Sequence, residues 1–177
     1  MSEADPAEPR ARRTWRTMLA VAVLLISTTA AAAPCEAPEF RSWDFWLGEW
    51  EVFDPAGQRV GSSRVEAIEQ ECALLETWTG RSETGRSLNV WDPVRRRWAQ
   101  LWIGGKAIVR LEGAPDAAGA IAMSGDVTYL TKSVSKPFRG EWRRLANGDV
   151  RQHFEERDPA TGQWKTWFTG LYRRKPQ

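Results

Sequence analysis

The chain has 177 residues, with 25 Lys and Arg against 23 Asp and Glu, so its formal net charge is only +2. This near balance argues against a nucleic-acid partner, and the short basic runs at 95–97 and 173–175 indicate ordinary solvated surface. The length suits one domain with its own core. Eleven tryptophans stand out, because rings of this size either pack in a core or line a binding site.

Residues 1–33 are predicted to be an export signal. A basic segment at 10–16 precedes an apolar segment at 18–26 and a small-residue end at 29–33. The apolar segment is shorter than the roughly 20 residues that a membrane-spanning helix needs, so we expect no stable membrane insertion after cleavage; a retained anchor is the alternative. A Sec signal is favoured, and Arg12-Arg13 leaves a twin-arginine signal open. The expected location is periplasmic or secreted.

Two cysteines, Cys35 and Cys72, remain after such a cleavage. An oxidising compartment favours a disulfide between them, which would contribute about 3–4 kcal/mol in the chain-entropy model. No histidine or carboxylate cluster accompanies them, so the sequence predicts no metal site. No motif for a cofactor or for catalysis appears in 34–177, and we assign neither.

The remaining 34–177 is predicted to be one all-β domain. Apolar residues at helical spacing over 39–47 indicate a short N-terminal helical turn. Runs of β-branched and aromatic residues, separated by Asp-Pro and Gly turn signals, then predict ten strands. These are expected at 49–54, 58–69, 72–80, 86–92, 97–103, 106–113, 120–128, 138–145, 149–157 and 163–173. Consecutive antiparallel strands avoid exposed edges by closing into a single up-and-down β-barrel; a two-sheet sandwich is the alternative.

Alternation along three of these strands gathers indoles and polar groups on the same face. Glu76 shares a face with Trp78, Asn89 with Trp91, and Gln100 with Trp102. The opposite faces are small or aliphatic, which leaves open which side is the interior. If the tryptophans point inward, they line a pocket for a small hydrophobic or aromatic ligand; otherwise they fill a narrow barrel. The candidate ligand-binding residues are therefore Glu76, Trp78, Asn89, Gln100 and Trp102.

Two further hypotheses belong to other functional classes. His153, the only histidine, shares a strand face with Arg151 and Glu155, and an enzyme could act in the lumen through His153 or Glu76. The alternative is an envelope interaction module whose tryptophans form an external platform for sugars or proteins. The sequence assigns no catalytic residue.

Gly48-Glu49-Trp50 resembles the G-x-W motif of the calycin superfamily, which includes lipocalins and fatty-acid-binding proteins. The segments at 43–50, 72–76, 91–93 and 169–172 together resemble a group of uncharacterised exported bacterial proteins with a calycin-like barrel. The resemblance implies that Trp50 plugs one end of the barrel and that Arg173 or Arg174 lies across it as a cation. It also implies a ligand-binding habit, and it implies no enzyme activity.

Overall fold

A computed structural model describes residues 35–176, so the predicted signal at 1–33 lies outside the described residues. The predicted helical turn is present as two short helices, α1 (Pro38–Arg41) and the 3-10 helix η1 (Asp44–Trp46). Among the described residues no helix has the length and apolar character needed to cross a membrane.

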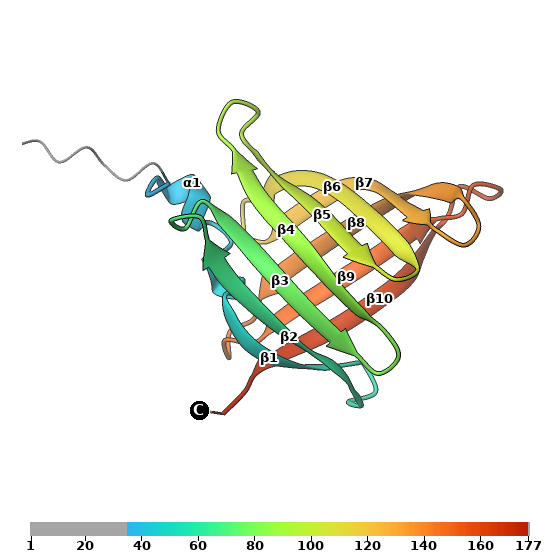
Figure 1. The fold of residues 1–177 in the computed structure, drawn as a ribbon, viewed down its shortest axis with the longest axis horizontal. Helices are drawn as coiled ribbons and strands as arrows, with labels where there is room; N and C mark the ends of the chain where they lie inside the picture. Colours follow the sequence, from blue (N-terminus) through green and yellow to red (C-terminus); the bar gives the residue numbers. More distant parts are fainter. Residues whose placement is uncertain (1–34, 177) are drawn as a thin grey trace, which may run out of the picture. The chain divides into compact units, whose positions relative to one another are not determined.

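The ten strands form one closed antiparallel barrel in which each strand pairs with the next and β10 returns to β1 (Figure 1). Their bounds are β1 (Gly48–Phe53), β2 (Arg59–Ile68), β3 (Ala73–Gly80), β4 (Thr84–Asp92), β5 (Arg97–Gly104), β6 (Ala107–Pro115), β7 (Ile121–Tyr129), β8 (Val134–Arg144), β9 (Val150–Arg157) and β10 (Trp164–Arg174). The predicted all-β, up-and-down barrel is confirmed, and the sandwich is not found.

Aspartates set several of the turns between strands. Carboxylate oxygens of Asp54, Asp92, Asp116 and Asp158 each accept hydrogen bonds from main-chain amides two to four residues further along. These are the local bonds that make Asp a turn residue. The turn signals in the sequence therefore place the strand ends.

One strand starts earlier than its sequence indicates. β8 begins at Val134 rather than at residue 138, and it includes Pro137. Residues 134–137 pair with β7, whereas pairing with β9 begins only at Phe138. Proline lacks an N–H and is tolerated where a strand has a neighbour on one side only, which explains both the extension and the error.

The tryptophan-bearing faces point into the barrel. Glu76, Ser87, Asn89 and Gln100 on these faces are buried. On the opposite face of β4 and β5, aliphatic side chains are exposed to solvent, namely Leu88, Val90, Leu101 and Ile103. The structure thus settles the orientation that alternation alone leaves open.

A cluster of indoles fills the barrel end nearest α1 and η1. The Trp43 ring stacks on Trp46 at 5.3 Å and meets the edges of Trp98 and Trp142 at 5.3 and 4.9 Å. All four rings are almost wholly buried. Trp50 belongs to the same tryptophan plug, since its Nε1 donates to the Trp46 carbonyl at 2.9 Å. This end of the barrel is packed.

Arg174, rather than Arg173, covers Trp50. The Arg174 guanidinium lies 4.4 Å from the Trp50 ring centroid and donates to the Leu47 carbonyl at 3.1 Å. Arg173 lies over Phe53 instead, at 4.7 Å. The strand register explains the choice, because Trp50 pairs with Arg174 and neighbouring residues face opposite sides.

The predicted disulfide is confirmed. Cys35 and Cys72 are bonded, with their Cα atoms 5.1 Å apart. Cys35 precedes α1, and Cys72 lies in the turn between β2 and β3. The bond therefore fastens the segment that carries Trp43 and Trp46 to the barrel wall.

Replacing Gly48 with alanine should destabilise the barrel by about 2–3 kcal/mol. Gly48 has φ +128°, and an added Cβ would lie 2.5 Å from Nη1 of Arg174. Both backbone strain and loss of the Arg174 contacts contribute. Urea unfolding followed by tryptophan fluorescence measures the change.

The matched control is Gly57→Ala, where φ is +78° and an added Cβ meets nothing within 4 Å. It carries the strain of a positive φ without the steric conflict, so it should cost only about 1 kcal/mol. Equal losses in the two variants would show that the Arg174 contact over Trp50 contributes nothing.

Candidate ligand-binding site

Beyond the tryptophan plug the barrel lumen holds a cavity of about 270 Å³. This volume is at the lower end of small-molecule pockets, which span roughly 300–1,000 Å³. Its lining residues are Glu76, Trp78, Glu83, Gln100, Trp102, Val109, Gln152, Phe154, Trp167, Phe168 and Tyr172. Four of the five predicted ligand-binding residues line it. The fifth, Asn89, is buried behind Gln100 and does not line the cavity.

The two cavity tryptophans lie against pairs of glycines. Trp102 covers Gly85 and Gly104, which are cross-strand partners on β4 and β5. A Cβ added at Gly85 would lie 2.5 Å from the Trp102 ring, and one at Gly104 would overlap it. Because the wall has no side chain at these points, the indole lies flat along it instead of projecting across the lumen.

Trp78 has the same arrangement on the next strand pair. Gly61 and Gly80 pair across β2 and β3, and Cβ atoms added there would lie 2.7 and 3.0 Å from the indole. Two phenylalanines repeat it on the far wall, where Phe154 lies against Gly140 and Phe168 against Gly170. Glycine beneath aromatic rings is therefore the local cause of the empty volume.

The floor of the cavity is a buried carboxyl group. Glu76 on β3 is only 3% exposed, and its two oxygens accept hydrogen bonds from Ser63 on β2 at 2.9 Å and Ser87 on β4 at 3.1 Å. Both serines are buried as well. The three residues meet because their positions on adjacent strands all face inward.

A main-chain carbonyl fixes the direction of this hydrogen-bond network. Asn89 Nδ2 donates to the Leu74 carbonyl at 3.1 Å and to Ser87 Oγ at 3.0 Å, so its Oδ1 must be the acceptor for Gln100 Nε2 at 2.7 Å. Ser87 thus accepts from Asn89 and gives its proton to Glu76. Asn89 contributes to the site by orienting Gln100 and Ser87.

Tyr172 on β10 and Gln152 on β9 complete the floor. The Tyr172 hydroxyl donates to Gln152 Oε1 at 2.6 Å, and Glu76 is the other acceptor near it. Burial raises the pKa of Tyr172 well above 10, and the nearby Glu76 carboxylate raises it further. The hydroxyl therefore remains a hydrogen-bond donor at physiological pH.

Burial also changes the acidity of Glu76. Desolvation raises its pKa from 4.5 to about 7, against the opposing effect of the hydrogen bonds from Ser63 and Ser87 and of the nearby Tyr172 hydroxyl. In the described part of the chain no Lys, Arg or His lines the cavity or pairs with this carboxyl. Glu76 consequently changes its charge near neutral pH.

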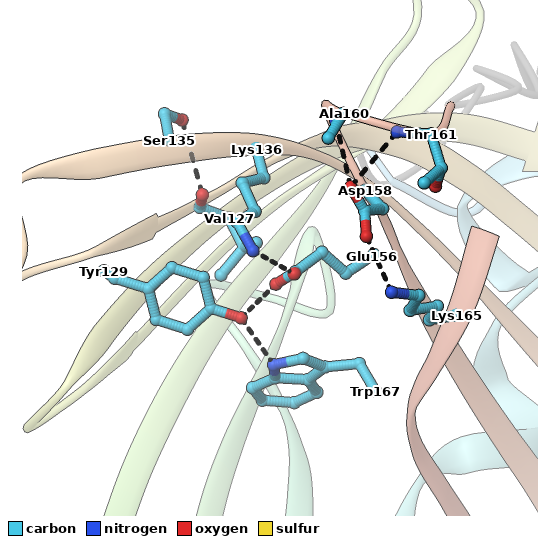
Figure 2. Close-up of polar contacts among 10 residues, drawn as sticks. All are labelled: Val127, Tyr129, Ser135, Lys136, Glu156, Asp158, Ala160, Thr161, Lys165 and Trp167. Atoms are coloured by element: carbon cyan, nitrogen blue, oxygen red, sulfur yellow. Dashed lines mark hydrogen bonds and ion pairs between the residues drawn. The ribbon is translucent and has the colours of Figure 1, made fainter. Parts of the chain in front are cut away.

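Trp167 is held at the cavity rim by residues from three neighbouring strands (Figure 2). Its Nε1 donates to the Tyr129 hydroxyl at 2.9 Å, Tyr129 donates to Glu156, and Lys136 pairs with the other Glu156 oxygen. Burial and the bond to Glu156 raise the pKa of Tyr129 to about 12. A register shift in β10 lets adjacent Trp167 and Phe168 both reach the cavity.

His153 lies outside the lumen. It alternates with the inward-facing Gln152 and Phe154, and its Nδ1 is 2.7 Å from the Thr169 hydroxyl. A catalytic role inside the barrel through His153 is therefore wrong. The external tryptophan platform is not found either, since Trp167 is the only exposed tryptophan within residues 35–176 and its ring lines the cavity.

Comparison of the chain with protein-family models gives no match, and no curated protein has a significantly similar sequence. Over residues 35–176 no group of three or more His, Cys, Asp or Glu side chains is placed to hold a metal ion. The site's chemistry is thus that of its own carboxyl, amide, hydroxyl and aromatic groups.

Seven lining residues, mainly on β9, β10 and the rim, are not predicted from the sequence. These are Glu83, Val109, Gln152, Phe154, Trp167, Phe168 and Tyr172. A usable signal was present: an aromatic residue followed two positions later by glycine occurs at Trp78, Trp102 and Phe168. In a strand that spacing puts the glycine beside the ring on the same face.

Glu76→Gln should remove a pH-dependent loss of stability. The pKa of Glu76 is about 7 when folded and 4.5 when free, so the folded state binds its proton more tightly. Stability from this group is greatest below pH 4.5, falls as the pH rises to 7, and stays low above it. The difference amounts to roughly 3 kcal/mol. Urea unfolding from pH 4.5 to 8 should show the variant gaining that much on the parent.

Glu66→Gln is the control for this comparison, because Glu66 lies outside on β2 beside Arg64 and away from the cavity. It should follow the pH profile of the parent. The stability difference between Glu76→Gln and the parent should change with pH. A constant difference would contradict a buried Glu76 carboxyl that ionises near neutral pH.

Proposed function

We propose that this chain is an exported, small-molecule-binding β-barrel protein that holds a small apolar or aromatic ligand in its lumen. Trp78 and Trp102 would form the walls, and Glu76 and Gln100 would orient the ligand's polar group. The carrying observation is that glycine pairs hold the cavity aromatics against the wall, leaving about 270 Å³ open above a buried polar floor. A barrel whose tryptophans served only as core would not need this arrangement.

The combination of surfaces supports binding of a ligand with one polar end. Aromatic rings surround the mouth and middle of the cavity, while Glu76, Gln100, Gln152 and Tyr172 gather at its floor. Ligand pockets are typically apolar with a few convergent polar groups that fix orientation. The volume favours a compound of one or two rings over a long-chain lipid or haem.

Export is supported by the Cys35–Cys72 disulfide, because such bonds persist in the periplasm and outside the cell. The predicted signal at 1–33 supports the same location. Membership in the calycin-like exported group is supported by the barrel itself and by Trp50 at its packed end under Arg174.

Catalysis through Glu76 is the second candidate function. One observation favours it: a carboxyl with a pKa near 7 faces the cavity beside the Tyr172 hydroxyl, and such a group can both accept and donate a proton at neutral pH. The two functions differ in what Glu76→Gln leaves behind. If the protein is an enzyme, the Glu76→Gln variant should bind the substrate without converting it. If it is a binding protein, the parent itself converts nothing.

Titrating the protein with indole, 2-phenylethanol, a long-chain fatty acid and haem tests the proposed function. The one- and two-ring compounds should change tryptophan emission because three indoles line the cavity. Gly104→Ala should weaken that binding by roughly tenfold or more, since the added methyl pushes the Trp102 ring into the cavity.

Gly105→Ala is the matched control, because the neighbouring glycine has open space where a Cβ would be added. It should bind like the parent. Silence across the small aromatic compounds, or equal binding by Gly104→Ala and the parent, would count against a ligand in this cavity.

A further inference from the structure

The cavity floor holds a carboxyl without a positive partner. Glu76 is 97% buried, accepts its hydrogen bonds from the neutral hydroxyls of Ser63 and Ser87, and has no cation beside it among residues 35–176. A buried carboxylate is costly unless a positive charge or several donors compensate it. The barrel supplies two hydroxyl donors and leaves the charge uncompensated.

The hydrogen-bonding positions left open at Glu76 and Gln100 are acceptors. Asn89 Nδ2 donates to the Leu74 carbonyl, and Asn89 Oδ1 accepts from Gln100 Nε2. The Ser87 hydroxyl donates its proton to Glu76. Gln100 therefore has its Oε1 left, with no partner within the described chain, and Glu76 has its other lone pairs. The Gln152 Nε2 is a donor that also faces the floor, because its Oε1 accepts from Tyr172. A group placed between Glu76 and Gln100 Oε1 would need to donate.

The walls and mouth favour positive charge as well. The faces of Trp78, Trp102, Phe154 and Phe168 carry negative electrostatic potential that attracts a cation. The only other ionisable carboxyl lining the cavity is Glu83 at the mouth, and its nearest cation, Lys106 at 3.9 Å, is largely exposed. All charged groups that line the cavity thus have the same sign.

The geometry points to a primary amine carried on a small aromatic or apolar body as the ligand of this cavity. The ammonium group would bind at Glu76 with Gln100 Oε1 as a second acceptor, and the ring would lie between the indoles of Trp78 and Trp102. This inference rests on the proposed function, since it names the ligand class for the same cavity.

Three compounds of similar shape test the inference, namely 2-phenylethylamine, 2-phenylethanol and 3-phenylpropionate. Calorimetric titration of the protein at pH 8 should rank the amine first, the alcohol second and the carboxylate last. The amine should bind roughly ten- to a hundredfold more tightly than the alcohol, the range expected for hydrogen bonds to a charged group.

Glu76→Gln should lower the affinity of the amine to that of the alcohol and leave the alcohol unchanged. Glu66→Gln, on the outer face, should retain the preference of the parent. Amine that binds Glu76→Gln and the parent equally would overturn the inference.

The pH dependence of the parent gives a second test that needs no variant. Lowering the pH from 8 to 6 should weaken the amine several-fold and leave the alcohol unchanged, because Glu76 becomes protonated while the amine keeps its charge. The titratable groups facing Glu76 are Tyr172 on β10 and Glu83 at the mouth; β2 and β4 present only Ser63 and Ser87. Tyr172 does not titrate in this range.

The outcomes separate the inference from the proposed function. The alcohol or the carboxylate could bind as tightly as the amine, with Gly104→Ala still weakening the binding. That result would overturn the amine as the ligand class and leave the ligand-binding function standing. Failure of all three compounds and of indole to bind at millimolar concentration would overturn both.

Discussion

The structure depends on how a ten-strand barrel fills its interior. A barrel of about eight strands is just wide enough for its own inward side chains to fill, and each added strand widens it. This chain fills one end with the plug formed by Trp43, Trp46, Trp50, Trp98 and Trp142. At the other end it has glycine where a second set of side chains would stand, and the lumen there stays open. Tryptophan therefore fills the barrel at one end and lines an open cavity at the other.

A carboxyl at the boundary between these two ends costs stability. Ionised Glu76 is surrounded by protein and has only hydroxyl partners, so the fold is less stable near neutral pH than it would be with an amide there. Residues that oppose stability in this way are concentrated at functional sites. The ordered network from the Leu74 carbonyl through Asn89 to Ser87 keeps that carboxyl in one orientation, which is useful for recognition and unnecessary for folding.

Much of the fold was predictable because residues close together in the sequence determine where the strands begin and end. Aspartate and glycine turns mark the strand ends, and nine of the ten strands begin within two residues of their predicted starts. The exception, β8, depends on Pro137 having a partner on one side only, which is a property of the neighbouring strands. The choice of Arg174 over Arg173 depends likewise on the register between β1 and β10.

The candidate site was predictable in part. Alternation grouped Glu76, Trp78, Gln100 and Trp102 correctly, because strands on adjacent hairpins share faces. It could not say that this face was the interior, since the outer side of β4 and β5 carries exposed leucine, valine and isoleucine. The meeting of Tyr172 with Glu76 joins residues almost a hundred positions apart across the lumen, and only barrel closure brings them together.

The pairing of β1 with β10, the seam of the barrel, determines when the barrel can close. It joins residues 50–53 to residues 171–174, so the sheet cannot become a barrel until nearly all of the described chain has been synthesised. A nascent chain that lacks β10 has an open sheet and no enclosed plug, and contacts so distant in sequence form slowly. The seam is thus the last strand pairing to form, whereas the Cys35–Cys72 bond joins two residues that are both present once the turn between β2 and β3 has been made.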